Sequence, residues 1–215
     1  MADNELNSQM GDSSVIRAVC VYCGSSPGAD STFMGASREL GRALAGANLK
    51  LIYGGGTTGL MGAVAHGTLD AGGDVGAIIP SFLINREANH ASLTMFEDLT
   101  ITDTMHERKR QMFDRSDAFV ALPGGIGTVE EIVEIMTWGQ LGRHRKPIVL
   151  VNINGFWNPL IALLDHLRDA GFIHSAKLLQ PIVAEQVKDV VPAILDAAVL
   201  VRVSAESEPA IIEKL

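Results

Sequence analysis

A glycine-rich segment that ends in two carboxylates, residues 122–131, carries the strongest chemical signal in this sequence. It reads Leu-Pro-Gly-Gly-Ile-Gly-Thr-Val-Glu-Glu. The apolar run 117–122 is typical of a buried parallel strand, and the apolar spacing after the glycines is typical of a helix. A glycine turn between a strand and a helix exposes backbone N–H groups that can bind a phosphate. We place Glu130 and Glu131 in the first helical turn, beside that anion site, which indicates chemistry on a phosphorylated substrate.

The same segment also has a purely structural interpretation. Carboxylates in a first helical turn stabilise the helix through its dipole, and glycines at such a turn can serve tight geometry alone. The basic pair Arg108-Lys109 lies upstream, on a predicted helix. It favours the functional interpretation, because basic side chains pair with phosphate.

Strands and helices alternate along the chain. The pattern predicts strands over residues 15–22, 49–53, 74–79, 99–102, 117–122, 147–151 and 182–184. It predicts helices over residues 32–45, 59–71, 105–115, 128–141, 159–170 and 187–198. This alternation is typical of an α/β fold of the Rossmann-like, doubly wound kind, a parallel sheet with helices on both faces in three layers. The turns at 23–26, 54–58 and 123–128 should then meet at one sheet edge.

Size and composition are those of one globular domain. The chain has 215 residues, 47% of them hydrophobic, and a net charge of −8. We expect a single nucleotide-binding domain over 15–203, a disordered leader over 1–14 and a loosely ordered tail over 204–215. The acidic balance argues against nucleic acid as a partner. No apolar run reaches the ~20 residues that span a bilayer, and no secretory pattern is visible, so we expect no membrane partner and a cytoplasmic location.

Two patterns suggest cofactors, and neither has the right context. Cys20 and Cys23 have the C-x-x-C spacing of redox or zinc sites, but Cys20 falls inside a strand and no second pair completes four ligands. The segment Gly54–Gly59 fits G-x-G-x-x-G, with Asp74 about 20 residues on, as in dinucleotide sites. It follows the second strand, however, and Asp74 begins a strand where a ribose-binding acid should end one. We therefore expect no metal and no cofactor.

The string Pro123 to Glu131 closely resembles the signature of the LOG family, the cytokinin riboside 5′-monophosphate phosphoribohydrolases, many of which were once labelled lysine decarboxylases. The resemblance extends from about Val15 to Val183. Further blocks match in the right order, at residues 23–26, 53–56, 59–62, 105–109 and 137–142.

The resemblance implies hydrolysis of the N-glycosidic bond of an adenine-type nucleoside 5′-monophosphate, either an N6-prenylated cytokinin ribotide or AMP. Glu131 and Arg108 match the family's catalytic pair. A carboxylate suits this reaction because positive charge develops at C1′. The implied substrate contacts are Glu87, Lys109, Gly125, Ile126, Gly127, Thr128, Val129, Glu130 and Thr137. The family's Pro-Arg-Glu is replaced here by Asn85-Arg86-Glu87, a departure that concerns base recognition more than catalysis.

Residues of the converging turns complete the expected binding site, namely Ser25, Gly54, Gly55, Gly56 and Gly124. Family members commonly form homodimers, and we expect the same here, with the helix 128–141 near the interface. Two other functions stay open. One is a non-catalytic protein that binds a nucleoside monophosphate, and the other is a nicotinamide-dependent oxidoreductase.

Overall fold

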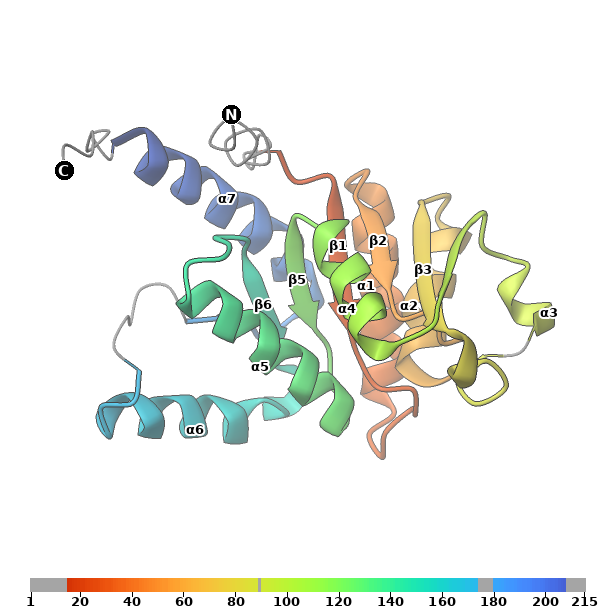
Figure 1. Ribbon diagram of the computed structural model, residues 1–215, viewed down its shortest axis with the longest axis horizontal. Coiled ribbons are helices and arrows are strands. Elements are labelled where there is room, and N and C mark those ends of the chain that lie inside the picture. Colours follow the sequence, from red (N-terminus) through yellow and green to blue (C-terminus); the bar gives the residue numbers. More distant parts are fainter. Residues whose placement is uncertain (1–14, 89, 174–179, 208–215) are drawn as a thin grey trace.

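A single parallel sheet of seven strands organises the computed structural model, which describes residues 15–88, 90–173 and 180–207 (Figure 1). The strands are β1 Ala18–Tyr22, β2 Lys50–Tyr53, β3 Val75–Pro80, β4 Asp98–Thr102, β5 Ala118–Ala121, β6 Ile148–Val151 and β7 Ile182–Ala184. Their order is β4-β3-β2-β1-β5-β6-β7, and each neighbouring pair is parallel. The predicted fold class is confirmed.

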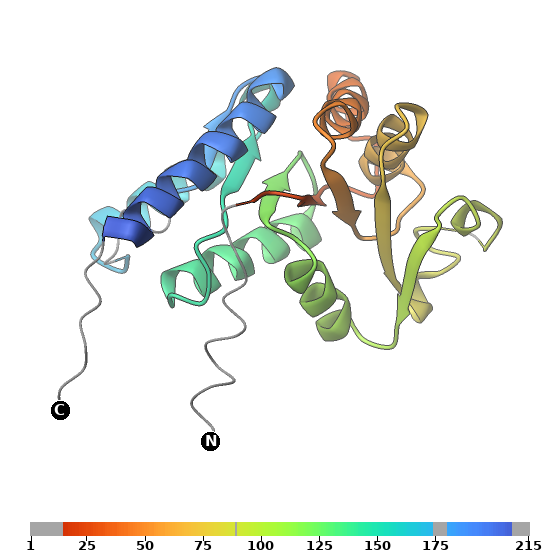
Figure 2. The ribbon, with the colours of Figure 1, turned by 90° about the horizontal axis from the view of Figure 1, so that it is seen from above.

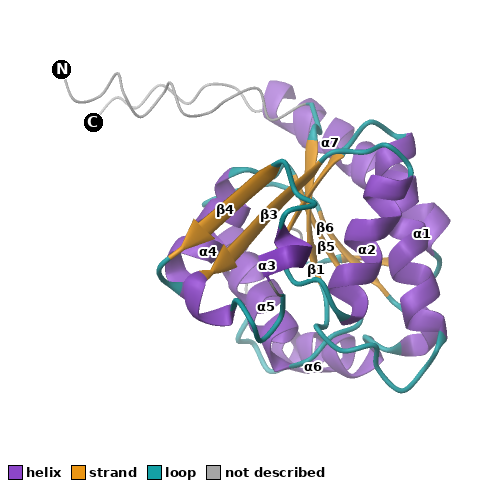
Figure 3. Cartoon of the chain, turned by 90° about the vertical axis from the view of Figure 1, so that its right-hand side faces the viewer, coloured by secondary structure: helices purple, strands orange, loops and turns teal. Residues whose placement is uncertain are grey.

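Helices cover both faces of the sheet (Figures 2 and 3). One face carries α1 Thr32–Gly46, α2 Gly59–Asp70 and α7 Val190–Ser207. The other carries α4 Met105–Asp114, α5 Ile126–Gln140 and α6 Asn158–Asp169. The short helix α3 His90–Leu93 and the 3₁₀ turns Ser81–Leu83, Ile153–Gly155 and Val187–Asp189 lie in the connections. No described helix is both long and apolar enough to cross a membrane.

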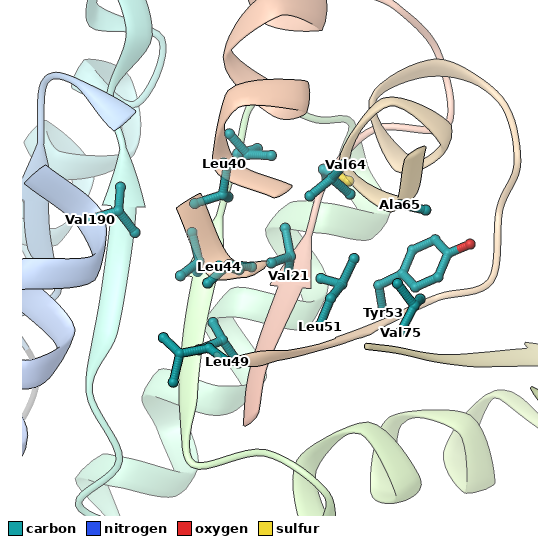
Figure 4. Close-up of a cluster of buried hydrophobic side chains, with 14 of the residues drawn as sticks. Val21, Leu40, Leu44, Leu49, Leu51, Tyr53, Val64, Ala65, Val75 and Val190 are labelled. Carbon is teal, nitrogen blue, oxygen red and sulfur yellow. The ribbon is translucent and has the colours of Figure 1, made fainter. Parts of the chain in front are cut away.

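The two faces hold separate hydrophobic clusters because side chains alternate along each strand. In β1, Val19 and Val21 join the cluster under α1 and α2, whereas Cys20 and Tyr22 join the cluster under α5. Figure 4 shows the first cluster, in which Leu40 of α1 packs toward the strands. The buried sheet thus gives a rigid base to the loops at its edge.

The strand order reverses at β1, which lies between β2 and β5. Ligands of doubly wound folds bind outside the carboxyl ends of the strands at such a point. The loops after β1 and β5 meet there, since the Gly24 N–H donates to the Pro123 carbonyl at 3.1 Å. This crevice is where the converging turns were predicted.

The helices that differ most from the prediction are α5 and α7, while the boundaries of the other predicted helices agree within one residue. The helix predicted to begin at Thr128 begins at Ile126, because Gly125 takes the N-cap position. The last helix begins at Val190, after the 3₁₀ turn Val187–Asp189, and continues to Ser207 instead of ending at Ala198, so it includes the first residues of the predicted tail. The predicted leader 1–14 and the rest of the tail, 208–215, lie outside the described residues.

Candidate active site

A cavity of about 330 Å³ lies at the carboxyl edge of the sheet, beside the crevice between β1 and β5. Both residues of the expected catalytic pair, Arg108 and Glu131, line it. So do six of the expected binding residues, namely Ser25, Glu87, Gly125, Gly127, Thr128 and Glu130. The structure therefore brings together residues from four separate parts of the sequence.

The N-terminus of α5 forms one wall of this cavity. Its N-cap is Gly125, which supplies no side-chain hydrogen bond, and the helical bonding begins with the Val129 N–H donating to the Gly125 carbonyl at 3.1 Å. The N–H groups of the first turn have no helical acceptor and can bind an anion. The first turn holds no acidic residue. Glu130 and Glu131 fall in the second turn, not the first as predicted, so the dipole interpretation no longer accounts for them.

The glycines of this turn have two different roles. A Cβ atom on Gly124 would lie 2.2 Å from Oγ1 of Thr128, so only glycine fits between α5 and the β1 loop. A Cβ atom on Gly125 or Gly127 would meet nothing within 4 Å. Gly124 therefore serves packing, whereas Gly125 and Gly127 leave the backbone open to a ligand. Of the neighbours predicted to bind, Ile126 is 85% exposed and Val129 packs on the core beneath α5.

The buried guanidinium of Arg108 lies against the loop after β2. Its Nη2 donates to the Gly54 carbonyl at 3.1 Å, and the residue is 4% exposed. Its Nε is buried without a partner among the described residues, as is Oε2 of Glu87. Buried polar atoms are nearly always hydrogen-bonded in proteins, so two such atoms beside one cavity indicate groups that a ligand would satisfy.

The three glycines after β2 were predicted to contact the substrate, and the structure gives them packing roles away from the cavity lining. A Cβ atom on Gly54 would lie 1.8 Å from Nη2 of Arg108. A Cβ atom on Gly55 would lie 2.8 Å from Cβ of Ile79, and one on Gly56 would lie 2.7 Å from Sδ of Met61. Their small size makes room for neighbouring side chains, above all for Arg108.

The start of α2 is also unsuited to the alternative dinucleotide site. The N–H groups of Leu60 and Met61 donate to the Gly24 carbonyl, at 3.0 and 3.2 Å. A pyrophosphate at a helix N-terminus needs such donors free. Among the described residues, the corresponding N–H groups at α5 have no acceptor, whereas those at α2 are occupied, so α5 is the better anion site of the two.

Glu131 is a buried carboxyl group at the base of the cavity, 8% exposed. Burial raises its pKa from the ordinary value of 4.5 to about 7, against the opposing effect of the nearby Arg108 guanidinium. The carboxylates of Glu130 and Glu87 raise the pKa further, and the Lys109 ammonium lowers it. A carboxyl group that titrates near neutral pH suits proton transfer under physiological conditions.

This shift predicts that Glu131→Gln stabilises the protein at alkaline pH. The folded state holds the Glu131 proton up to about pH 7, whereas an ordinary carboxyl releases it near 4.5. Wild-type stability therefore falls as the pH rises between these values, by a few kcal/mol at about 1.4 kcal/mol per pKa unit. Thermal unfolding should show similar Tm values at pH 4.5 and a higher Tm for the variant at pH 8.5. Equal Tm values at pH 8.5 would contradict the burial argument.

Lys109, a predicted substrate contact, does not line the cavity. Its Nζ forms ion pairs with Glu130 at 2.6 Å and with Glu134 at 3.1 Å. Burial alone would lower the pKa of Lys109, but the hydrogen bonds to these two glutamates outweigh it and raise the pKa above its ordinary value. This pairing was not predicted from the sequence, although the i, i+4 spacing of Glu130 and Glu134 is a signal for a shared partner.

Thr137, another predicted substrate contact, lies outside the cavity that holds Glu131. Its hydroxyl donates to the Val133 carbonyl at 2.8 Å, and the residue lines a second cavity of about 230 Å³ between α5, α6 and residues 172–173 and 180–181. Within this chain it is not part of the cavity that holds Glu131.

The cavity also has an apolar wall that sequence reasoning did not assign to the site. It consists of Met61, Leu83 and Met105. Two of these, Met61 and Met105, belong to the matched blocks, which was the available signal. The nearby Cys23 lines the cavity as well, while Cys20 is in the core; burial raises the pKa of both thiols.

Comparisons with known proteins identify the family of this chain. A protein-family model described as "Possible lysine decarboxylase" matches residues 61–194. The cytokinin riboside 5′-monophosphate phosphoribohydrolase of Rhodococcoides fascians is 42% identical over 179 residues, covering 83% of this chain and 89% of that protein. The cytokinin riboside 5′-monophosphate phosphoribohydrolase LOG3 of Arabidopsis thaliana is 44% identical, over 79% of this chain and 77% of that protein.

Among solved structures, a Moco carrier protein from Chlamydomonas reinhardtii aligns with a TM-score of 0.64 over 86% of this chain and 99% of that one. At 21% identity, this likeness shows the fold alone. The family model covers more than half of the chain, and both relatives align over most of it. The chain therefore belongs to the LOG family of phosphoribohydrolases.

Proposed function

We propose that this protein hydrolyses the N-glycosidic bond of adenine-type nucleoside 5′-monophosphates, releasing the free base and ribose 5-phosphate. The observation that carries the proposal is the pairing of two features in one cavity. An uncapped helix N-terminus lies beside a buried carboxyl group and a buried guanidinium, Glu131 and Arg108. A phosphate anchored at α5 would hold its ribose over these two groups.

The chemistry follows from their properties. The bond from C1′ to the base nitrogen breaks while water adds to C1′, and positive charge develops on the ribose. The carboxylate of Glu131 stabilises that charge and accepts the proton of the attacking water. Its pKa of about 7 lets it release that proton again, ultimately to the departing base. The Arg108 guanidinium, with a free buried Nε, stabilises negative charge on the departing base.

The apolar wall supports N6-prenylated ribotides as the preferred substrates. Met61 and Met105 are flexible and polarisable, and with Leu83 they would contact a prenyl group without needing one tight fit. The names of the relatives point the same way. An apolar contact of this kind discriminates by only about 1–3 kcal/mol per group, so AMP should be a slower substrate rather than an excluded one.

Base release tests the proposal directly. Purified protein is incubated with isopentenyladenosine 5′-monophosphate, with AMP and with the two dephosphorylated nucleosides, and free base is measured by liquid chromatography. Base from the monophosphates but not from the nucleosides supports a phosphate-anchored hydrolase. Binding of both monophosphates without base release would favour the non-catalytic alternative.

We also propose that the protein is a homodimer through the face of α5 and α6. Large apolar side chains are exposed there, including Val133 at 40%, Leu163 at 51% and Phe172 at 74%. Thr137, matched to a substrate contact of the family, lies on this same face. A dimer would bury these side chains and could bring Thr137 toward the partner's cavity.

Light scattering after gel filtration should give twice the chain mass at micromolar concentration. The double variant Val133→Ser, Phe172→Ser should elute as a monomer, because it removes apolar area from the proposed interface. Leu195→Ser is the matched control, since Leu195 is 43% exposed on α7, on the opposite face of the sheet. A monomeric wild-type protein would refute the dimer.

A further inference from the structure

Lys109 links α4 to α5 through a small ion cluster in which the lysine side chain is mostly covered and the glutamates are partly exposed. Its ammonium lies between the carboxylates of Glu130 and Glu134, and its side chain is only 11% exposed. These three residues are called the Lys109 clamp below. Glu134 lies one turn beyond Glu130, so the two carboxylates reach the ammonium from the same face of α5.

Each side of the clamp adjoins one residue of the proposed catalytic pair. Arg108 precedes Lys109 on α4, and Glu131 follows Glu130 on α5. Successive residues of a helix point about 100° apart. Arg108 and Glu131 can therefore line the cavity while Lys109 reaches across to the neighbouring helix.

The clamp joins the N-terminal half of α4, which carries Arg108, to α5. Near its C-terminus, α4 packs on α5 through the rings of Phe113 and Trp138, whose centroids lie 4.8 Å apart. Throughout residues 15–88, 90–173 and 180–207, the hydrogen bonds and ion pairs between α4 and α5 are those that Lys109 makes. Without them, no hydrogen bond or ion pair between described residues would join α4 to α5, and the remaining polar anchor of the Arg108 side chain on the protein backbone would be its hydrogen bond to the Gly54 carbonyl.

We propose that Lys109 is a positioning residue, which keeps Arg108 and Glu131 at the separation that bond cleavage requires, and is not a ligand of the substrate phosphate. The inference rests on the proposed function. Lys109 does not line the cavity, and two carboxylates already engage its ammonium. A phosphate would have to compete with both of them.

The clamp also affects the electrostatics of Glu131. The charged groups that face this carboxyl are Arg108 and Lys109 from α4, Glu130 from α5 itself and Glu87 from the segment after β3. Lys109 lowers the pKa of Glu131, whereas Glu130 raises it. Removal of either charge should therefore move the acid limb of the pH–rate profile, and in opposite directions.

The test compares Lys109→Met, Lys109→Arg and Glu130→Gln with the wild type in base release from isopentenyladenosine 5′-monophosphate between pH 5 and 9. For Lys109→Met we expect kcat to fall by about tenfold or more, with KM changed by less than about twofold. The acid limb should move to higher pH in Lys109→Met and to lower pH in Glu130→Gln. Lys109→Arg keeps the charge and should recover most of kcat.

Calorimetry measures the affinity for ribose 5-phosphate without any turnover. It can therefore test the role of Lys109 in phosphate binding even if the proposed hydrolysis does not occur. Lys109→Met should bind this phosphate as tightly as the wild type. Weaker binding, or a raised KM at unchanged kcat, would show a phosphate ligand and overturn the inference. Acid limbs that stay in place would overturn it as well. A wild-type protein that releases no base would instead refute the proposed function.

Discussion

Glu131→Gln is expected to reduce base release by about a thousandfold, because the amide can neither accept a proton from water nor offset the positive charge on the ribose. The amide has the shape of the carboxyl group, so the cavity should keep its form. The expected phosphate anchor is the backbone at the start of α5, which the substitution leaves unchanged. Calorimetry should therefore show wild-type affinity for ribose 5-phosphate.

The matched control is Glu39→Gln, an exposed glutamate of α1 on the opposite face of the sheet. It removes the same charge far from the cavity and should leave the rate unchanged. If Glu131→Gln turned over substrate at the wild-type rate, the proposed mechanism would be wrong even though the protein was a hydrolase.

Gly54→Ala should abolish most activity although Gly54 does not line the cavity. The added methyl group would lie 1.8 Å from Nη2 of Arg108, closer than any two such atoms can approach. The guanidinium must then leave its hydrogen bond to the Gly54 carbonyl. A displacement of about 1 Å can cost about a hundredfold in rate. We expect base release near that of Arg108→Ala and a lower Tm.

The double variant Gly54→Ala, Arg108→Ala makes this prediction specific. With the Arg108 side chain removed, the alanine at position 54 has room, so the double variant should have the Tm of Arg108→Ala alone. Gly35→Ala is the control, since a Cβ atom there meets nothing within 4 Å and the residue lies within α1. Additive losses of Tm in the double variant would show that the Arg108 contact is not the cause.

The fold could be predicted because its signals are local. Short apolar runs such as Ala118–Ala121 alternate with amphipathic stretches, and this pattern specifies a parallel sheet with helices on both faces. Helix ends were harder to predict. The glycine turn was predicted to extend to Thr128, yet α5 begins directly after Gly125 and includes Ile126 and Gly127. The valines at 199, 201 and 203 are poorer helix formers than the leucine and arginine between them, but α7 continues through all of them.

The sequence could predict which residues belong to the site, but not which of their side chains line the cavity. Arg108 and Lys109 are adjacent in the sequence, where the first matched the family's catalytic arginine and the second a substrate contact. Only the packing of α4 on α5 decides that one lines the cavity and the other pairs with glutamates. The same holds for Thr137, which is on the motif's helix but faces α6. A motif specifies which residues occur together, while the tertiary structure determines where each side chain points.

The reversal of strand order at β1 has a consequence for folding. The walls of the cavity come from two halves of the chain, with Ser25 and Glu87 in the first and Arg108 and Glu131 in the second. These halves join where β1 pairs with β5, about a hundred residues later in the chain. Contacts so distant in sequence form slowly during folding. A bound nucleotide that spans the cavity therefore links both halves, and its binding free energy adds to the cooperativity of the whole domain.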